Sequence, residues 1–245
     1  MAQRATKAGY SSCHCLKHSH STGIMQPFAR IIAIAALTAF CSGPRAEPAT
    51  PPEFVVGEGS QQLAERWWRW AMSSPRENNP VVDRTGANCA VGQQGGTWFL
   101  AGGFGSSKIS RRCVVPADKA LFFPLVNSSN HAPRGNTSLT CDQVKALAEI
   151  PNDKALTLFA EVDGKPLGGL KKYRITSQEC FDMFEKVLAR KSAYTGFPAA
   201  ADGYWLLIQP LARGEHVLKF GGAYEGTLGN NEELIQDIEY VLVVQ

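Results

Sequence analysis

The chain has 245 residues, of which 44% are hydrophobic and 19% charged, a composition typical of a folded protein. Its formal net charge is +3, but the first 46 residues hold five of the 25 basic residues and no acidic one. The remainder therefore carries 20 basic and 22 acidic residues, a net charge of −2. Since it lacks the positive field that attracts a phosphate backbone, we expect no nucleic-acid partner.

The N-terminal region has the anatomy of a secretory signal. Arg30 precedes the ten-residue apolar run 31–40 (IIAIAALTAF), and small or helix-breaking residues follow as far as Ala46. Ten residues are too few to cross a bilayer, which needs about 20 in a helix. We therefore interpret residues 25–46 as a signal peptide. The mature protein is expected to be periplasmic or extracellular, with no transmembrane span.

Residues 1–24 precede Met25, which itself begins a signal of ordinary length. We interpret them as the product of a mis-set start codon or as an extended n-region. They contain the cluster CHCLKHSH (13–20), whose thiol and imidazole groups suit zinc or copper. Because either interpretation places this cluster before the cleavage site, we expect it to be absent from the mature protein. We predict no metal and no cofactor.

Residues 47–57 form a proline-rich lead that begins EPATPP, and residues 58–245 are expected to fold as a single β-rich domain. The first predicted helix covers 61–72. Its apolar stripe consists of Leu63, Trp67, Trp70 and Ala71, and Trp68 is expected to point away from that stripe.

Two β-strands are predicted next, at 97–101 and 120–126. Pro124 cannot donate a hydrogen bond to a neighbouring strand, which favours an edge position or a bulge for the second strand. The polar stretch 127–137 (NSSNHAPRGNT) is predicted to be a loop. Loops carry a disproportionate share of functional residues, so Asn127 and His131 become candidate site residues.

A second helix is predicted from Thr140, because Thr140 and Gln143 form a capping box and Leu139 and Val144 a hydrophobic staple. Pro151 is expected to end it. A strand at 156–162 alternates apolar and polar residues, and the dipeptide Asp-Gly at 163–164 then predicts a tight hairpin turn.

The remaining strands are predicted at 173–176, 204–209, 216–221 and 238–244, with a third helix after Thr176 in which Thr176 and Glu179 form a capping pair. The strands YWLLI (204–208) and YVLVV (240–244) are apolar on both faces, which indicates central positions. The whole pattern predicts a mainly β fold: a mostly antiparallel β-sandwich or jelly-roll-like domain with two or three peripheral α-helices.

Four cysteines follow the signal, an even number that indicates disulfide bonds in an exported chain. Three pairings are available to four cysteines. We predict Cys89 with Cys113, which would close a β-hairpin, and Cys141 with Cys180, which would join two helix starts.

Five sequence stretches resemble a set of uncharacterised exported bacterial proteins. These are WWRWA (67–71), DRTGANC (83–89), TWFLAGG (97–103), RRCVVPADKALFFPLVN (111–127) and ADGYWLLIQPLARGEHVLKFGG (201–222). Asp118 stands where that pattern has glycine. The resemblance implies export and a common fold, and it implies no particular activity.

Aromatic residues give the one positive indication of a binding site. Trp68 and Tyr204 offer flat surfaces that could stack on a sugar ring, and Arg66 and Arg69 could hold an anionic group. The ligand-binding candidates are Trp68, Arg69, Asn127, His131 and Tyr204.

We therefore expect an exported binding or structural protein rather than an enzyme, with a small molecule or glycan as ligand. One alternative is a thiol-dependent enzyme in which Cys141, at the start of a helix, acts as a thiolate and His131 as its base. Another is a subunit of an envelope assembly that uses an exposed sheet edge, with an envelope protein as its partner.

Overall fold

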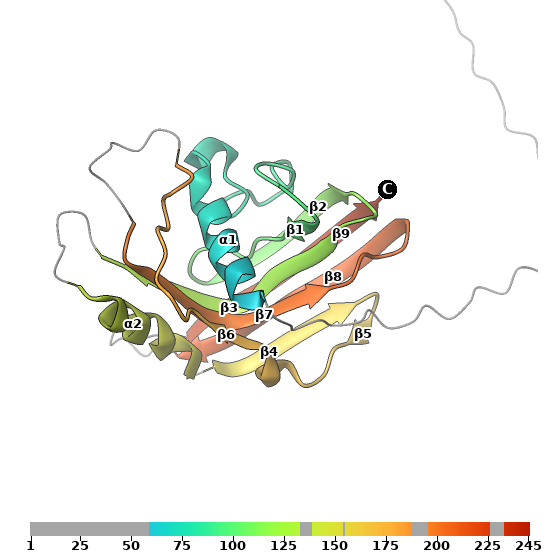
Figure 1. Cartoon of the computed structure of the whole chain (residues 1–245). Coiled ribbons are helices and arrows are strands. Elements are labelled where there is room, and N and C mark those ends of the chain that lie inside the picture. The colour runs from blue at the N-terminus through green and yellow to red at the C-terminus, as the bar shows by residue number, and fades with distance from the viewer. Residues whose placement is uncertain (1–58, 133–138, 154, 188–195, 226–232) are drawn as a thin grey trace, which may run out of the picture. The chain divides into compact units, whose positions relative to one another are not determined.

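The computed structural model describes residues 59–132, 139–153, 155–187, 196–225 and 233–245 (Figure 1). The interpretations of residues 1–24, of the signal peptide 25–46 and of the lead 47–57 fall outside these ranges. Within them, no helix combines the length and the apolar character that a membrane span requires.

Two mixed sheets form a β-sandwich. The four-stranded sheet has the order β1 (Thr97–Phe99), β3 (Ala120–His131), β7 (Ala199–Ile208) and β6 (Arg174–Thr176). The five-stranded sheet has the order β2 (Ser107–Val115), β9 (Glu233–Val244), β8 (Gly214–Glu225), β4 (Ala155–Val162) and β5 (Lys165–Pro166). The pairs β1–β3 and β2–β9 are parallel, and the other pairs are antiparallel. This confirms the fold class expected from the sequence.

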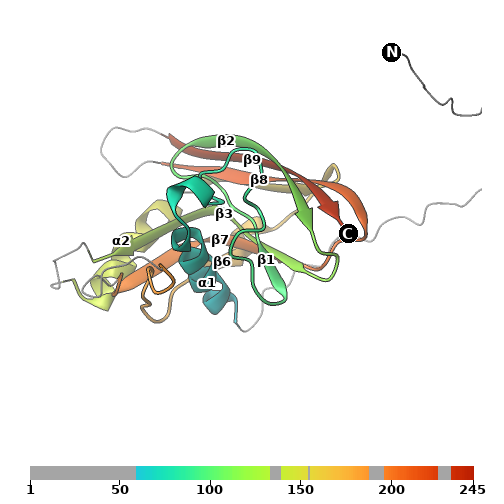
Figure 2. The same ribbon diagram turned by 90° about the horizontal axis from the view of Figure 1, so that it is seen from above.

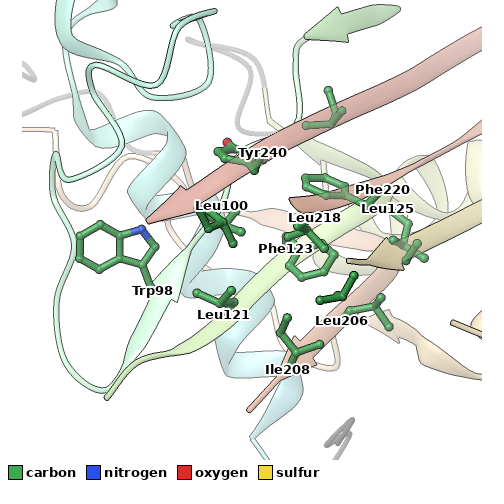
Figure 3. Packing of buried hydrophobic residues seen from close by; sticks show 14 of the residues in the cluster. Trp98, Leu100, Leu121, Phe123, Leu125, Leu206, Ile208, Leu218, Phe220 and Tyr240 are labelled. Atoms are coloured by element: carbon green, nitrogen blue, oxygen red, sulfur yellow. The ribbon is translucent and has the colours of Figure 1, made fainter. Parts of the chain in front are cut away.

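Side chains from both sheets meet in the core between them (Figure 3). The rings of Phe123 on β3 and Phe220 on β8 lie 4.5 Å apart, centroid to centroid. Leu206 and Ile208 of β7 enter the same core, whereas Trp205, between them in sequence, points to the outer face of the four-stranded sheet. This alternation is the two-residue period of a strand, and it lets β7 pack on both faces.

Two α-helices cover opposite faces of the four-stranded sheet. The first, α1 (Ser60–Ser73), packs on its outer face, so that the five-stranded sheet, the four-stranded sheet and α1 form successive layers (Figure 2). The second, α2 (Cys141–Asp153), lies at one end of the sandwich. Val144 and Ala148 of α2 contact Ala200 on β7, whereas the neighbouring Ala199 and Ala201 face the α1 side. Short 3-10 helices occupy Arg76–Asn78 and Leu170–Tyr173.

The start of α2 is as predicted. Gln143 Oε1 accepts a hydrogen bond from the Thr140 N–H at 2.8 Å, and Thr140 Oγ1 accepts one from the Gln143 N–H at 3.3 Å. Leu139 packs beside Val144, which completes the hydrophobic staple. The predicted end is wrong, because the helix passes Pro151 and ends at Asp153.

All seven predicted strands are present, and β7 and β9 are central as expected. The ladder between β3 and β7 shifts register between Pro124 and Val126, which confirms the bulge, but β3 lies between two strands and not at an edge. Since β3 runs on to His131, Asn127 and His131 are strand residues. The loop predicted from Asn127 was wrong because pairing with β7 extends the strand.

The helix predicted after Thr176 does not form within the described residues. Thr176 belongs to β6 and pairs with Asp202 of β7. The Ser177 N–H donates to the Ala201 carbonyl oxygen at 2.8 Å, and the Ser177 hydroxyl accepts from the Ala201 N–H at 2.9 Å. Long-range pairing with β7 therefore overrides the local capping signal of Thr176 and Glu179.

Both predicted disulfides are present, Cys89–Cys113 with 5.9 Å between Cα atoms and Cys141–Cys180 with 5.8 Å. Their structural contexts differ from those expected. Cys113 lies on β2, whose strand partner is β9, so the first bond ties a preceding loop to the sheet and closes no hairpin. Cys180 lies outside any helix, and its bond joins α2 to the segment that follows β6.

A buried arginine on β2 fixes the loops on either side of β1. Arg111 is 2% exposed and donates five hydrogen bonds, to the carbonyl oxygens of Val81, Asp83, Ala101 and Gly102 and to the Tyr240 hydroxyl. All five of its N–H groups therefore have acceptors, which offsets the cost of burying the guanidinium.

The motif DRTGANC is a loop closed by its own aspartate. The Asp83 carboxylate accepts from the N–H groups of Thr85, Gly86 and Asn88. Although burial acts to raise the pKa of Asp83, these hydrogen bonds outweigh it and lower the pKa. Gly86 has a φ of 95°, and a Cβ there would lie 2.2 Å from the Arg112 carbonyl oxygen. The loop therefore requires glycine at this position.

Candidate functional site

A pocket of about 560 Å³ lies along the flank of α1. It is lined by residues of α1 and the turn that follows it, of the loop before β1, of β1 itself and of the segment after β6. These residues are Arg66, Trp70, Ser73, Ser74, Pro75, Gly92, Gln94, Phe99 and Lys186.

The spacing of the helix residues explains how α1 contributes to this pocket. Arg66, Trp70 and Ser73 recur at intervals of four and three, which places them on one flank of the helix. The Trp70 Nε1–H donates to the Val91 carbonyl oxygen at 2.8 Å and holds the loop against the helix. A Cβ on Gly92 would lie 3.2 Å from Trp70 Cδ1, so the backbone of this loop packs closely on the indole.

The pocket is cationic. Two of its lining residues are basic and none is acidic. Among the described residues, neither Arg66 nor Lys186 has a carboxylate oxygen within 4.0 Å. The Arg66 guanidinium lies over the Phe99 ring, with 5.7 Å between its carbon and the ring centroid. This contact orients the guanidinium and leaves its N–H groups available for an acceptor.

Arg69, a predicted ligand-binding residue, is instead held by other parts of the protein. Its Nε lies 2.9 Å from Glu185 Oε2, and its Nη1 lies 3.5 Å from Glu65 Oε2. The Arg69 Nε–H also donates to the Asp182 carbonyl oxygen at 3.3 Å, and the guanidinium lies over the Phe181 ring. Arg69 therefore attaches the segment after β6 to α1.

The expected outward direction of Trp68 was wrong, since its side chain is buried and 7% exposed. The apolar stripe of α1 is wider than predicted and includes Ala64 and Trp68 as well as Trp67 and Ala71. Trp68 meets Trp67 edge to face, with 5.2 Å between ring centroids. Stacking of a ligand on Trp68 would require this cluster to open.

Tyr204 is also buried, in the core between the sheets, on the opposite face of β7 from the cluster that contains Trp68. The structure therefore does not bring Trp68 and Tyr204 together. Both were candidates because their aromatic rings could stack on a ligand. Since strand 204–208 is apolar on both faces, its sequence does not show which face a residue joins.

Four buried N–H donors have no hydrogen-bond acceptor among the described residues: Trp68 Nε1, Trp98 Nε1, Trp205 Nε1 and Asn127 Nδ2. By contrast, the Trp67 Nε1–H donates to the Leu100 carbonyl oxygen at 2.9 Å.

Asn127, a predicted ligand-binding residue, pairs with Gly203, and a Cβ on Gly203 would lie 2.7 Å from the Asn127 Cβ. The Asn127 side chain therefore lies on the outer face of the sheet, as Trp205 does.

His131 and Cys141 lie on different faces of the four-stranded sheet. His131 pairs with Ala199, on the α1 side, and its ring meets Phe184 with 5.2 Å between centroids. Burial lowers the pKa of His131, which favours the neutral form of its imidazole. Cys141 begins α2, on the opposite face, and its sulfur is bonded to Cys180. A thiolate at Cys141 therefore requires reduction of this bond.

No protein-family model, curated protein or solved structure matches the chain. Within the described ranges, no three His, Cys, Asp or Glu side chains gather in an arrangement that could hold a metal ion.

Proposed function

We propose that this chain is an exported binding protein that holds a small molecule or glycan in the pocket along α1. The observation that carries the proposal is the pocket itself, whose volume of about 560 Å³ falls in the range of small-molecule sites. Ser73, Ser74 and Gln94 offer hydroxyl and amide groups that could orient a polar ligand, and Pro75 adds an apolar contact.

The lining of this pocket supports binding better than catalysis. Ser73 is a potential nucleophile, but its hydroxyl donates to the Trp70 carbonyl oxygen at 2.8 Å. The lining includes no histidine or carboxylate that could act as its base. The thiol alternative is supported less well, because Cys141 is in a disulfide bond.

Two disulfides support export, because such bonds persist mainly in oxidising compartments. The resemblance to exported bacterial proteins and the signal-like segment 25–46 also support export.

The assembly-subunit alternative loses support at one sheet edge, since the loop 83–89 covers part of β2. There the Arg112 N–H donates to the Thr85 carbonyl oxygen, and Arg84 Nη2 donates to that of Lys108.

A ligand screen with a blocked pocket tests this proposal. The melting temperature of the mature protein is measured against a panel of neutral and acidic sugars, amino acids and aromatic acids. We expect at least one compound to raise it, and Gln94→Trp, which fills the pocket from an exposed position, to abolish that rise. Gln209→Trp, on an exposed residue outside the pocket, is the matched control. A hit that Gln94→Trp leaves unchanged would refute the assignment of the site.

A further inference from the structure

The charge of the residues that line the pocket along α1 indicates the charge of its ligand. The chain beyond residue 46 carries a net charge of −2, with acidic and basic residues nearly equal in number. A pocket with two basic residues and no acidic residue therefore differs from the average surface of the molecule. Burying a ligand against two cations without a counter-charge favours a ligand that brings negative charge.

We infer that the ligand carries a carboxylate, bound by Arg66 and assisted by Lys186. This inference rests on the proposed function and deepens it. Arg66 is the better placed of the two to recognise a planar group, because its guanidinium presents a rigid fork of N–H donors that matches the two oxygens of a carboxylate.

The surroundings of Arg66 hold this fork in place. The Arg66 guanidinium carbon lies over the Phe99 ring, 5.7 Å from its centroid. On another side lies Gly95, where an added Cβ would be 3.7 Å from Arg66 Nη2. The loop before β1 thus approaches the guanidinium closely. Because Arg66 forms no ion pair within the described protein, binding a carboxylate there breaks no internal salt bridge.

Arg69 lies one turn further along α1 and differs from Arg66 because it forms ion pairs within the protein. Its guanidinium is already paired with the carboxylates of Glu65 and Glu185, which would repel an incoming carboxylate. Of these two arginines, Arg66 is therefore the one that is available to a ligand. Lys186 lies just after Glu185 and adds a second positive charge to the lining without matching a planar group.

The size of the pocket favours an organic acid over an inorganic anion. A pocket of about 560 Å³ is much larger than acetate or phosphate, so most of it would hold the rest of the ligand. The hydroxyl and amide groups of Ser73, Ser74 and Gln94 would contact that part. A sugar acid has both features, a carboxylate and several hydroxyl groups.

Calorimetric titration with matched pairs of ligands tests the inference. The probes are glucuronate with glucose, phenylacetate with phenylacetamide, and succinate with succinamide; inorganic phosphate and acetate are titrated alone. We expect at least one acid to bind about 10- to 100-fold more tightly than its neutral counterpart. Arg66→Gln should remove that difference, and Arg66→Lys, which keeps the charge without the fork, should remove most of it. Lys186→Gln should reduce it less.

Arg76→Gln, at an exposed arginine on the 3-10 helix after α1 and outside this pocket, is the matched control and should leave all affinities unchanged. Circular dichroism of each variant checks that it folds. A neutral member that binds as tightly as its acid, an affinity that Arg66→Gln leaves intact, or no binding by any acid would overturn the inference. The inference would also be overturned if phosphate bound and none of the organic acids did. A neutral ligand that is still blocked by Gln94→Trp would overturn the carboxylate while leaving the proposed function standing.

Discussion

The guanidinium of Arg111 donates a hydrogen bond of 3.0 Å to the hydroxyl of Tyr240, and both side chains are buried. The guanidinium carbon also lies 5.4 Å from the Tyr240 ring centroid. Tyr240 OH in turn donates to the Ala101 carbonyl oxygen at 2.9 Å. This pair joins β2 and β9 to the loop after β1.

Arg111→Met is expected to destabilise the fold by at least about 3 kcal/mol, because it leaves several buried carbonyl oxygens without a donor. Arg112→Gln is the control, since Arg112 is exposed and its ion pair with Glu215 is worth about 0–1 kcal/mol. Urea unfolding followed by circular dichroism measures both. Equal stability of the two variants would show that the buried network contributes nothing.

The tryptophans of α1 should all behave as core residues. Trp67→Ala, Trp68→Ala and Trp70→Ala should each cost about 3–5 kcal/mol, because each removes a buried indole. Retention of parental stability by Trp68→Ala would restore the outward orientation that the sequence suggested.

Replacement by phenylalanine separates the hydrogen bond from the packing. Trp67→Phe removes the donor to the Leu100 carbonyl oxygen, whereas the indole N–H of Trp68 has no acceptor among the described residues. We therefore expect Trp67→Phe to cost about 1–3 kcal/mol more than Trp68→Phe. Chemical denaturation compares the two, and the reverse order would refute this assignment of the hydrogen bonds.

The disulfides should stabilise the fold to different degrees. They join residues separated by 24 and 39 positions in the sequence. By the loop-entropy relation, removing the Cys89–Cys113 bond should cost about 3.5 kcal/mol and removing the Cys141–Cys180 bond about 4 kcal/mol. Paired Cys→Ala variants measure these values. In the oxidised protein, rapid alkylation of Cys141 at neutral pH would instead support the thiol-enzyme alternative.

Asp163 should make stability depend on pH. Burial acts to raise its pKa, but hydrogen bonds from His216 at 2.7 Å and from the Val217 N–H at 2.8 Å lower it overall. The ionised carboxylate therefore stabilises the fold above the unfolded pKa of about 3.9, and this contribution is lost as the pH falls through the lower folded pKa.

Asp163→Asn keeps a residue that tolerates the φ of 50° at this turn and removes the charge. The variant should be less stable than the parent at pH 6, and the difference should shrink below about pH 4. Asp237→Asn, in an exposed ion pair with Lys108, is the comparison variant. A stability difference at position 163 that stays constant from pH 6 to pH 2 would contradict the assigned role.

The sequence predicted β4 well, because apolar and polar residues alternate along that strand. It missed β2, although the strand alternates buried and exposed residues, because one of the buried positions is Arg111. From sequence alone, a charged residue is expected to be exposed. The carbonyl oxygens that accept hydrogen bonds from Arg111 belong to other segments of the chain. The local signal of Thr176 and Glu179 failed for a related reason, since pairing with β7 determines that segment.

The candidate site was predictable only in part. Arg66 was noted beside Arg69 as able to hold an anion, but the five ligand-binding candidates did not include it, and none of those five lines the pocket. Lys186 and Gln94 had no distinguishing local pattern. The pocket draws residues from α1, from the loop before β1 and from the segment after β6, which are far apart in sequence. Hydrophobic periodicity carries no information on such a combination, whereas the fold brings it together by packing the other two segments beside α1.

A chemical-shift titration of the isotope-labelled mature protein shows where the ligand binds. The probe is the compound that raises the melting temperature most in the screen, added stepwise while backbone amide and arginine Nε–H signals are recorded. We expect the largest changes on residues 66–74, on Gly92 and Gln94 and on Lys186, and we expect the Arg66 Nε–H signal to be among them. Changes confined to other parts of the sandwich, with these signals unmoved, would contradict this expectation.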